Sequence, residues 1–459
     1  MKAILPVFDD SRKTPYYLQL YSYIKESILS GETTEGEKLP SLRSLAQSTG
    51  LSVTTVEQSY NQLLVEGYIY AKPQSGYYVS NVPKRRNSAV PVIQGGINSE
   101  VSVIDETAGA EIPAMKYDPE SFDFNKWKKC MNKILTDYSP ALLFEGSAQG
   151  ESALRAEIAA YLYTSRGVSC SPDQIIIGAG TQQITNQLAT LLRKQGVEHV
   201  ALEDPGYMPV RNVFRDRGFA ITPVAVKENG LAIEKLPANI RAAAYVSPSN
   251  HAYTGSVMPI GRRYELLNWA EENDSYIIED DYDSELRYFG KPIPALKSLA
   301  GSDRVIYLSS FSSTLFAALR ISYMVLPSSM TEIFSSIAGD YSPSCSKLEQ
   351  LTLAMFMESG MYQTHIKKLR KLYSQKLARI TDVFETEASD FIRVVSSTSG
   401  LSIILEIDTA KSPDQIKKDA ESIGIPAVCV GNRTILYYNQ IPLADTASAA
   451  KHLAALWRQ

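Results

Sequence analysis

The stretch Pro40-Ser41-Leu42-Arg43-Ser44-Leu45-Ala46, followed by Thr49-Gly50-Leu51-Ser52-Val53-Thr54-Thr55-Val56, determines the fold expected for the first part of the chain. Ser41 stands where a side chain caps a helix, and Gly50 lies in the turn Thr49-Gly50-Leu51-Ser52 that follows this helix. Apolar residues recur at helical spacing on both sides of the turn. The pattern therefore predicts two helices joined by a short glycine-containing turn.

The flanking sequence extends this unit in both directions. Apolar residues at helical spacing predict an earlier helix over residues 16–29, which Gly31 ends, and the helix that begins near Val53 is expected to stop at Gly67. Tyr68-Ile69-Tyr70 and Tyr77-Tyr78-Val79 are expected to be two strands. Three helices followed by a two-stranded wing form a winged helix-turn-helix, whose third helix enters the major groove of DNA.

Polar side chains on the third helix and the wing are the candidate contacts with DNA, because they can hydrogen-bond phosphates or base edges. The first 86 residues hold ten Lys and Arg against eight Asp and Glu, a balance that permits nucleic-acid binding without requiring it. A three-helix packing module with a solvated polar face would show the same helices. The candidate DNA-binding residues are Ser41, Arg43, Ser52, Thr54, Thr55, Gln58, Lys72, Ser75 and Gly76.

The runs Gly36 to Ala46 and Leu51 to Val56, with Gly67-Tyr68, resemble the DNA-binding domain of the GntR family over residues 12–80. The resemblance implies a partner of double-stranded operator DNA. Relatives usually carry an arginine directly after the serine of the turn, where this chain has Val53. That difference implies another operator preference, or an affinity weaker by the roughly 1–3 kcal/mol of one base contact.

Residues 81–110 have a different composition, with Pro83, Lys84-Arg85-Arg86, Pro91 and Gly95-Gly96 among small and polar residues. This composition predicts a flexible tether. The expected organisation is therefore a winged helix-turn-helix domain at 1–80, a linker at 81–110 and a large domain at 111–459.

The large domain alternates helical patterns with short apolar, β-branched segments. Such alternation predicts an α/β fold with a mostly parallel sheet and helices on both faces. Ligands of these sheets bind at the carboxyl ends of the strands. The expected strands are 174–177, 199–202, 242–246, 276–278, 305–308 and 321–326, and the clearest helical stretches are 154–166, 181–193 and 262–272.

Four motifs follow the expected strands. Gly178-Ala179-Gly180-Thr181-Gln182-Gln183 joins a strand to a helix whose N-terminus can hold a phosphate, although many tight turns use glycine without a ligand. Glu203-Asp204-Pro205-Gly206-Tyr207 brings an aromatic ring to the sheet edge, where core or rim packing is the alternative. Ile278-Glu279-Asp280-Asp281-Tyr282-Asp283 is a strand that runs into carboxylates, and a buried carboxylate there needs a cationic partner. Ser309-Ser310-Phe311-Ser312-Ser313-Thr314-Leu315 is the fourth motif, with Arg320 shortly after it.

In this order the motifs resemble fold-type-I aminotransferases, which use pyridoxal phosphate, and the whole chain resembles the MocR-type branch of GntR regulators. The resemblance implies that several positions bind this cofactor. By the resemblance, Gly180, Thr181, Gln182, Ser310 and Arg320 hold the phosphate, Tyr207 stacks on the ring, Asp280 pairs with the ring nitrogen and Tyr282 donates to the ring hydroxyl.

The chain departs from the aminotransferase pattern at three places. Ser313 stands at the position of the Schiff-base lysine, and a hydroxyl cannot form a Schiff base. The nearest lysines, Lys291 and Lys297, lie outside the motif. Ile435 stands near the position of the arginine that grips the substrate carboxylate, although Arg433 would point to the same face of the strand. The loop Ser247 to Gly255 has Ala252 and Tyr253 where aminotransferases have asparagine and proline.

These departures predict a regulator without enzyme activity. We expect a homodimer that binds DNA and senses a small-molecule effector, either pyridoxal phosphate held non-covalently or an amino-acid-like compound. A purely structural dimerisation domain is the first alternative, and a working aminotransferase is the second.

Cellular location and metal binding follow from simpler features. The N-terminus shows no signal-peptide pattern and no apolar run is long enough to span a membrane, so a cytoplasmic protein is expected. The four cysteines and four histidines are scattered, so no metal site is expected.

Overall fold

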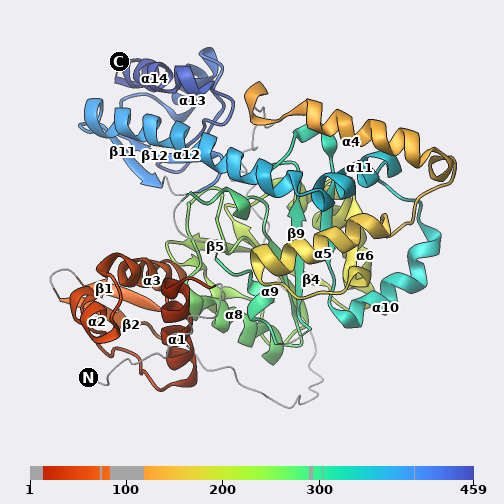
Figure 1. The fold of residues 1–459 in the computed structure, drawn as a ribbon, viewed down its shortest axis with the longest axis horizontal. Coiled ribbons are helices and arrows are strands. Elements are labelled where there is room, and N and C mark those ends of the chain that lie inside the picture. The colour runs from red at the N-terminus through yellow and green to blue at the C-terminus, as the bar shows by residue number, and fades with distance from the viewer. Residues whose placement is uncertain are drawn as a thin grey trace.

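The computed structural model describes residues 14–72, 75–82, 118–288, 293–301, 303–396 and 399–458 (Figure 1). Most of the tether expected over 81–110 lies outside the described residues, as does Lys291. No helix in the described part of the chain is both long and apolar enough to cross a membrane.

The first domain is the predicted winged helix-turn-helix. Ser41 and Ser52 cap the second and third helices by accepting the N–H groups of Ser44 and Thr55. The phenol of Tyr60 is buried and donates to the carbonyl of Pro40, which ties the third helix to the turn before the second. The elements are α1 (Tyr16–Ser30), α2 (Leu42–Thr49), α3 (Val53–Glu66), β1 (Ile69–Lys72) and β2 (Gly76–Val79).

An eight-stranded sheet with the order β3-β10-β9-β8-β7-β4-β5-β6 forms the centre of the large domain. The ladders from β9 through β8, β7 and β4 to β5 are parallel, whereas β10 and β6 are antiparallel to their neighbours. The α/β prediction is confirmed, with a mixed sheet. Its strands are β3 (Ile175–Gly178), β4 (His199–Asp204), β5 (Ala220–Lys227), β6 (Gly230–Leu231), β7 (Ala242–Val246), β8 (Tyr276–Asp280), β9 (Val305–Ser310) and β10 (Ser322–Val325).

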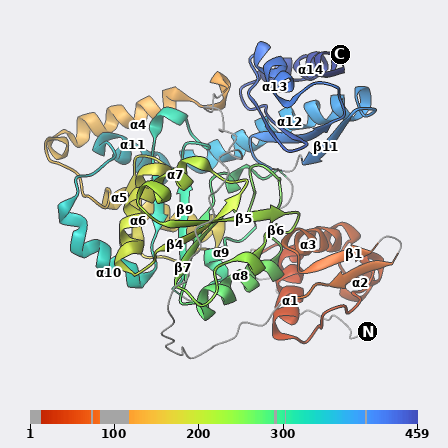
Figure 2. The same cartoon turned by 180° about the vertical axis from the view of Figure 1, so that it is seen from behind.

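Helices cover both faces of this sheet because its strands are apolar on both sides. Ile175 and Ile177 of β3 pack in the same cluster as α5, whereas Ile176 packs with α6 on the opposite face. Figure 1 shows α5 and α9 in front of the sheet, and the opposite view in Figure 2 shows α6 and α7 covering its other face. The flanking helices are α4 (Phe124–Asp137), α5 (Ser152–Arg166), α6 (Thr181–Lys194), α7 (Met208–Asp216), α8 (Ile260–Glu272), α9 (Leu296–Leu299), α10 (Ser328–Ile337) and α11 (Lys347–Glu358).

The C-terminal part has a second, four-stranded antiparallel sheet with the order β11-β12-β14-β13. It packs on α12, which is 27 residues long and also reaches the large sheet domain (Figure 1). Of these four strands, only β14 is predicted from the sequence. The elements are α12 (Met361–Glu387), β11 (Ile392–Ser396), β12 (Ser402–Ile407), α13 (Pro413–Ser422), β13 (Ala427–Val430), β14 (Arg433–Tyr437) and α14 (Thr446–Arg458).

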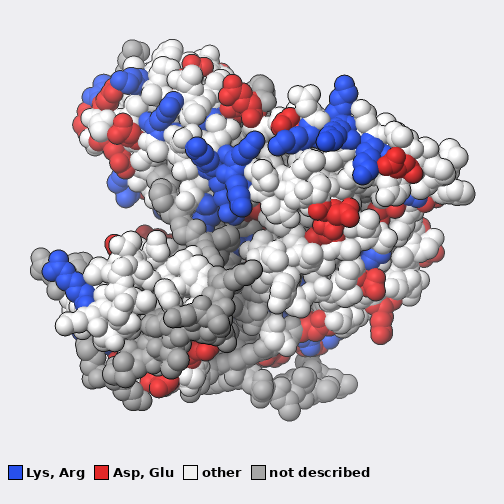
Figure 3. Space-filling view, viewed as in Figure 1, with Lys and Arg blue, Asp and Glu red and all other residues white. Residues whose placement is uncertain are grey.

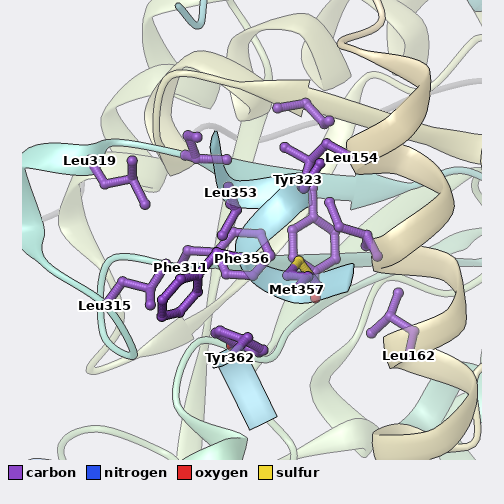
Figure 4. Close-up of a cluster of buried hydrophobic side chains, with 14 of the residues drawn as sticks. Leu154, Leu162, Phe311, Leu315, Leu319, Tyr323, Leu353, Phe356, Met357 and Tyr362 are labelled. Carbon is purple, nitrogen blue, oxygen red and sulfur yellow. The ribbon is translucent and has the colours of Figure 1, made fainter. Parts of the chain in front are cut away.

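An aromatic cluster anchors the loop that follows β9. Phe311 and Leu315 of this loop are buried, and Phe311 packs edge-on against Tyr362 at the start of α12 (Figure 4). Phe356 and Met357 of α11 belong to the same cluster. The polar residues between Ser310 and Thr314 are therefore held by apolar neighbours on two helices.

The winged helix packs directly on the large domain at the start of α8. Ile260 is buried among the apolar residues of the winged helix. Gly67 ends α3 with a φ of 78°, and a Cβ atom there would lie 2.9 Å from Cβ of Pro259. This contact leaves no room for a side chain between the two domains.

We predict that Gly67→Ala destabilises the winged helix more than Gly50→Ala does. Both glycines have a left-handed φ, which costs an alanine about 1–2 kcal/mol, but a Cβ at Gly50 meets no atom within 4 Å. The overpacking against Pro259 should add about 1–3 kcal/mol. Hydrogen exchange of the amides of residues 53–72 and 75–80 measures the difference, and equal protection in the two variants would contradict the tight contact.

Candidate ligand pocket and DNA-binding face

The glycine turn after β3 lies against the guanidinium group of Arg320. Gly180 has a φ of 93°, and a Cβ atom there would overlap Nη2 of Arg320. The turn leads into α6, whose first N–H groups have no partners within the helix. Thr181 is half-buried and Gln182 is exposed in the first turn. A helix N-terminus beside an arginine is an arrangement that suits an anion such as phosphate.

Ser310, at the end of β9, is linked by hydrogen bonds to the strand that follows Arg320. Its Oγ accepts the hydroxyl of Ser322 at 2.9 Å and the N–H of Ser312 at 3.2 Å. Ser310 and Ser322 are also register partners in the β9–β10 ladder. The hairpin thus holds Ser310 and Arg320 on one edge of the sheet.

Asp280 ends β8 as a buried carboxyl group, and it accepts a hydrogen bond from the phenol of Tyr245 on β7. Burial raises the pKa of Asp280 to about 7. The phenol of Tyr207 lies within the field of both Asp280 and Arg320: burial and Asp280 raise its pKa, and Arg320 opposes them. Three residues from separate motifs therefore meet at the carboxyl ends of the strands.

Glu203 is a second buried acid beside Asp280, and it is not among the residues predicted from the sequence. Its Oε1 accepts the N–H of Ser247 at 3.0 Å, and burial raises its pKa to about 8. His251 lies 3.7 Å away but bonds the carbonyl of Pro205, and burial lowers the pKa of His251 to about 4. The imidazole is then neutral at pH 7, so its contact with Glu203 is not an ion pair.

Asp281, next to Asp280 on the chain, has the kind of cationic partner that a buried carboxylate at this strand end needs. Arg166 at the end of α5 donates from Nε and Nη2 to its two oxygens at 2.7 and 2.9 Å. Tyr307 adds a hydrogen bond of 2.5 Å. Within the described residues no ion pair joins Asp280 to a cation. Of the two adjacent carboxyl groups, Asp281 is therefore paired with an arginine there and Asp280 is not.

Ser313 is buried, and its hydroxyl donates to the backbone carbonyl of Tyr282. The phenol of Tyr282 is close to Asp283, Tyr437 and Asp280, and burial raises its pKa well above the usual value. Lys297 donates to the carbonyl of Val305, the first residue of β9 and therefore at the other end of that strand.

The late strand β14 places Ile435 in an apolar cluster with Tyr253 and Tyr437. Arg433, on the same face, donates to the carbonyl of Thr254 at 3.1 Å and lies 3.9 Å from Glu406. Its guanidinium is therefore engaged with the loop that contains Ala252 and Tyr253.

The candidate DNA-binding residues on the helices of the winged helix are of two kinds: some cap a helix, and others are exposed without that role. The hydroxyls of Ser41 and Ser52 are helix caps, and Ser52 also bonds Thr55 at 2.7 Å. Arg43, Thr54 and Gln58 are exposed.

On the wing, Lys72 lies over the ring of Tyr78, whose hydroxyl bonds Ser75 at 2.6 Å. Gly76, with a φ of 110°, begins the second wing strand. The rings of Tyr70 and Tyr78 stack on each other. The sequence predicts a strand for each tyrosine, but it does not show that the two rings are in contact.

Two family models match the chain. "Bacterial regulatory proteins, gntR family" covers residues 16–79 and "Aminotransferase class I and II" covers residues 114–423. An uncharacterized HTH-type transcriptional regulator of Bacillus subtilis (strain 168), YdeL, is 36% identical over 99% of both chains. The "Probable rhizopine catabolism regulatory protein MocR" of Rhizobium meliloti is 30% identical over 91% of this chain and 87% of its own. The structure of LysN, an α-aminoadipate aminotransferase of Thermus thermophilus, has a TM-score of 0.64 at 23% identity and covers 74% of this chain and 90% of that one.

These features define a transcription regulator that combines a gntR-type winged helix with a fold-type-I aminotransferase-like domain. The chain belongs to the MocR-like HTH-type regulators, in which the two domains are fused. Within the described residues, no group of three or more His, Cys, Asp or Glu side chains could hold a metal ion.

We predict that the pocket acids make the protein less stable as pH rises. Glu203 and Asp280 have folded-state pKa values of about 8 and 7, above the roughly 4 of an unfolded chain. The folded state therefore binds more protons between pH 4 and 8, and this stabilisation is full below pH 4 and lost as pH rises through 7 to 8.

Glu203→Gln keeps a neutral hydrogen-bond acceptor, so it should flatten the decline by about 2–4 kcal/mol. The exposed Glu421→Gln is the matched control. Thermal unfolding midpoints measured from pH 5 to 8 check the prediction, and a wild-type stability that rises over this range would show it to be wrong.

Proposed function

We propose that this regulator senses a small ligand in the aminotransferase-like domain and transmits its binding to the winged helix, without transaminase activity. The proposed units are residues 1–80, which read DNA, the linker 81–110, and residues 111–459, which dimerise and bind the ligand. The observation that carries the proposal is the path of residues 247–259 between the pocket and the winged helix.

This segment contacts both sites. At the pocket end, Ser247 bonds the buried acid Glu203, and Asn250 donates to Asp283 at 2.8 Å. At the other end, Pro259 packs against Gly67 of the winged helix. A ligand that changes the charge or position of the pocket acids therefore acts on the same segment that the winged helix touches. Such a ligand shifts the protein only by binding the two arrangements unequally.

The buried Arg263 ties the two ends of this segment together. Its guanidinium donates to the carbonyls of Pro248 and Met258 at 2.8 and 2.9 Å. It also lines a small cavity together with Glu66 of α3. A rigid segment supports transmission, because a displacement at one end is not absorbed between the two sites.

Pyridoxal phosphate is the ligand that the pocket fits best. When bound, this cofactor supplies a phosphate, a ring nitrogen and an aldehyde that reacts with amines. The turn at Gly180 beside Arg320 suits the phosphate, and Asp280, which forms no ion pair within the described residues, suits a protonated ring nitrogen. The proposed contacts are Gly180, Thr181, Gln182, Ser310 and Arg320 for the phosphate, Tyr207 for the ring face, Asp280 for the nitrogen and Tyr282 for the ring hydroxyl.

The absence of an amine sets the binding mode in this proposal. We take Ser313 to occupy the position of the Schiff-base lysine, and its hydroxyl is already bonded to the carbonyl of Tyr282. Lys297 is engaged at the other end of β9, so it cannot substitute. Binding is then non-covalent and transamination is absent. An amino-acid-like effector in the same pocket is the second candidate, because Arg433 lies near the loop at its edge.

Exposed apolar side chains support the proposed homodimer. Leu143 and Phe144, which follow α4, are 85% and 72% exposed. Large apolar side chains that remain this accessible mark an association surface. Tyr138 and Tyr341, also exposed, belong to the same side of the domain through the bond of Lys347 to the carbonyl of Phe144.

We predict that calorimetric titration with pyridoxal phosphate shows binding to the wild type, and that Arg320→Gln weakens it about tenfold or more through the lost charged hydrogen bonds. Arg193→Gln, at the far end of α6, is the charge-matched control. Absence of heat from the wild type would favour a purely structural domain.

Ser313→Lys should gain a bond to the cofactor that borohydride makes permanent and intact mass detects, whereas the wild type should not. A permanent adduct on the wild type would contradict the non-covalent mode and reinstate the aminotransferase alternative.

The proposed DNA contacts are Ser41, Arg43, Ser52, Thr54, Thr55 and Gln58 with Lys72, Ser75 and Gly76 of the wing. Val53→Arg should tighten binding to a mixed-sequence duplex and steepen its dependence on salt by about one ion, because one more phosphate is neutralised. Val53 is exposed at the first position of α3. Val65→Arg, exposed near the other end of the same helix, is the matched control. Equal gains in both variants would show only an effect of net charge.

A further inference from the structure

The large domain carries a surface of lysines that belongs neither to the pocket nor to the winged helix. These side chains project from the exposed faces of α4 and of the first half of α12. Figure 3 shows Lys and Arg gathered over these two helices, on the face where the winged helix is also in view. We name as the basic surface the six exposed residues Lys128, Lys129, Lys133, Lys367, Lys368 and Lys371.

The two lysine-bearing helices begin beside the same imidazole ring. The ring of His365 on α12 lies 5.2 Å from that of Phe122, just before α4. Burial lowers the pKa of His365, and the positive charges of Lys126 on α4 and Lys368 on α12 lower it further. The first turn of α4 and the start of α12 are therefore close together, and lysines project from both helices.

No anionic partner in the described part of the chain balances these charges. None of the six lysines forms an ion pair or a hydrogen bond there. The pairs Lys129–Lys133 and Lys367–Lys371 have the i,i+4 spacing at which like charges destabilise a helix. An arrangement that is unfavourable by itself is stabilised by an external polyanion.

We propose that the basic surface binds the phosphate backbone of duplex DNA that flanks the site held by the winged helix. Lysine ammonium groups are point charges that suit phosphates without reading sequence. The chain as a whole is acidic, with 46 Lys and Arg against 50 Asp and Glu, so this positive surface is local rather than general. DNA held by the winged helix is tethered to the same molecule, which gives its flanks a high effective concentration at this surface. The inference rests on the proposed DNA binding of the winged helix.

The test compares one DNA sequence at two lengths. A duplex that the full-length protein selects from a random library is prepared as a core of about 20 base pairs and with flanks that extend it to about 80. Two triple variants, Lys128→Gln with Lys129→Gln and Lys133→Gln, and Lys367→Gln with Lys368→Gln and Lys371→Gln, remove three charges each. Lys417→Gln with Lys418→Gln and Lys451→Gln, on α13 and α14, is the control of equal charge.

Each basic-surface variant should bind the long duplex about tenfold more weakly, with a salt slope reduced by about two to three, and bind the core within about twofold of wild type. The control triple should match wild type on both duplexes. Unchanged binding to the long duplex, or the same loss in the control, overturns the inference while core binding keeps the proposed function intact. If the variants lose binding to phosphatidylserine vesicles but still bind the long duplex like wild type, the inference is overturned in favour of a membrane partner. A wild type that selects no duplex overturns both proposals.

Discussion

The buried ion pair between Arg166 and Asp281 is the interaction on which the arrangement of the pocket depends. A guanidinium group that is buried loses its hydration, and hydrogen bonds within the protein must replace it. All three nitrogen atoms of the Arg166 guanidinium donate such bonds. Besides the two oxygens of Asp281, Arg166 donates to the hydroxyl of Ser249 at 2.9 Å and to the carbonyl of Ile293. One side chain thus joins α5, the end of β8 and the segment 247–259. Removal of either charge would leave the other buried and unpaired.

This pair explains why two adjacent carboxyl groups behave differently. Successive residues at the end of a strand point to opposite faces, so Asp281 reaches Arg166 while Asp280 faces Tyr245 and Glu203. Burial raises the pKa of Asp280 and that of Glu203, and no ion pair within the described residues offsets the effect at Asp280. The fold therefore pairs a carboxylate with an arginine on one side of β8 and leaves two acids with raised pKa values on the other, where the glycine turn and Arg320 converge.

Local signals in the sequence were sufficient for the winged helix and for the order of pocket motifs. A cap such as Ser41, and glycine at helix ends, act within a few residues and can be recognised without tertiary structure. Glu203 could not be recognised as a buried acid, because its burial depends on β7 and on the loop after it. The C-terminal sheet was missed for another reason: residues such as Arg393 and Glu406, at paired positions, interrupt the apolar pattern of its strands.

The protonated acids also bear on how the regulator could respond to its ligand. A cationic group that binds beside Asp280 favours its carboxylate form, so binding near or below the raised pKa of about 7 releases a proton and uses part of the binding energy to do so. A new charge also changes the field at Glu203, which holds Ser247 at the start of the segment that touches the winged helix. An enzyme pocket with a resident lysine would supply a positive charge permanently. Ser313 carries no charge, so in the proposed binding mode the ligand itself would bring the positive charge that reaches Asp280, and that charge can carry the signal.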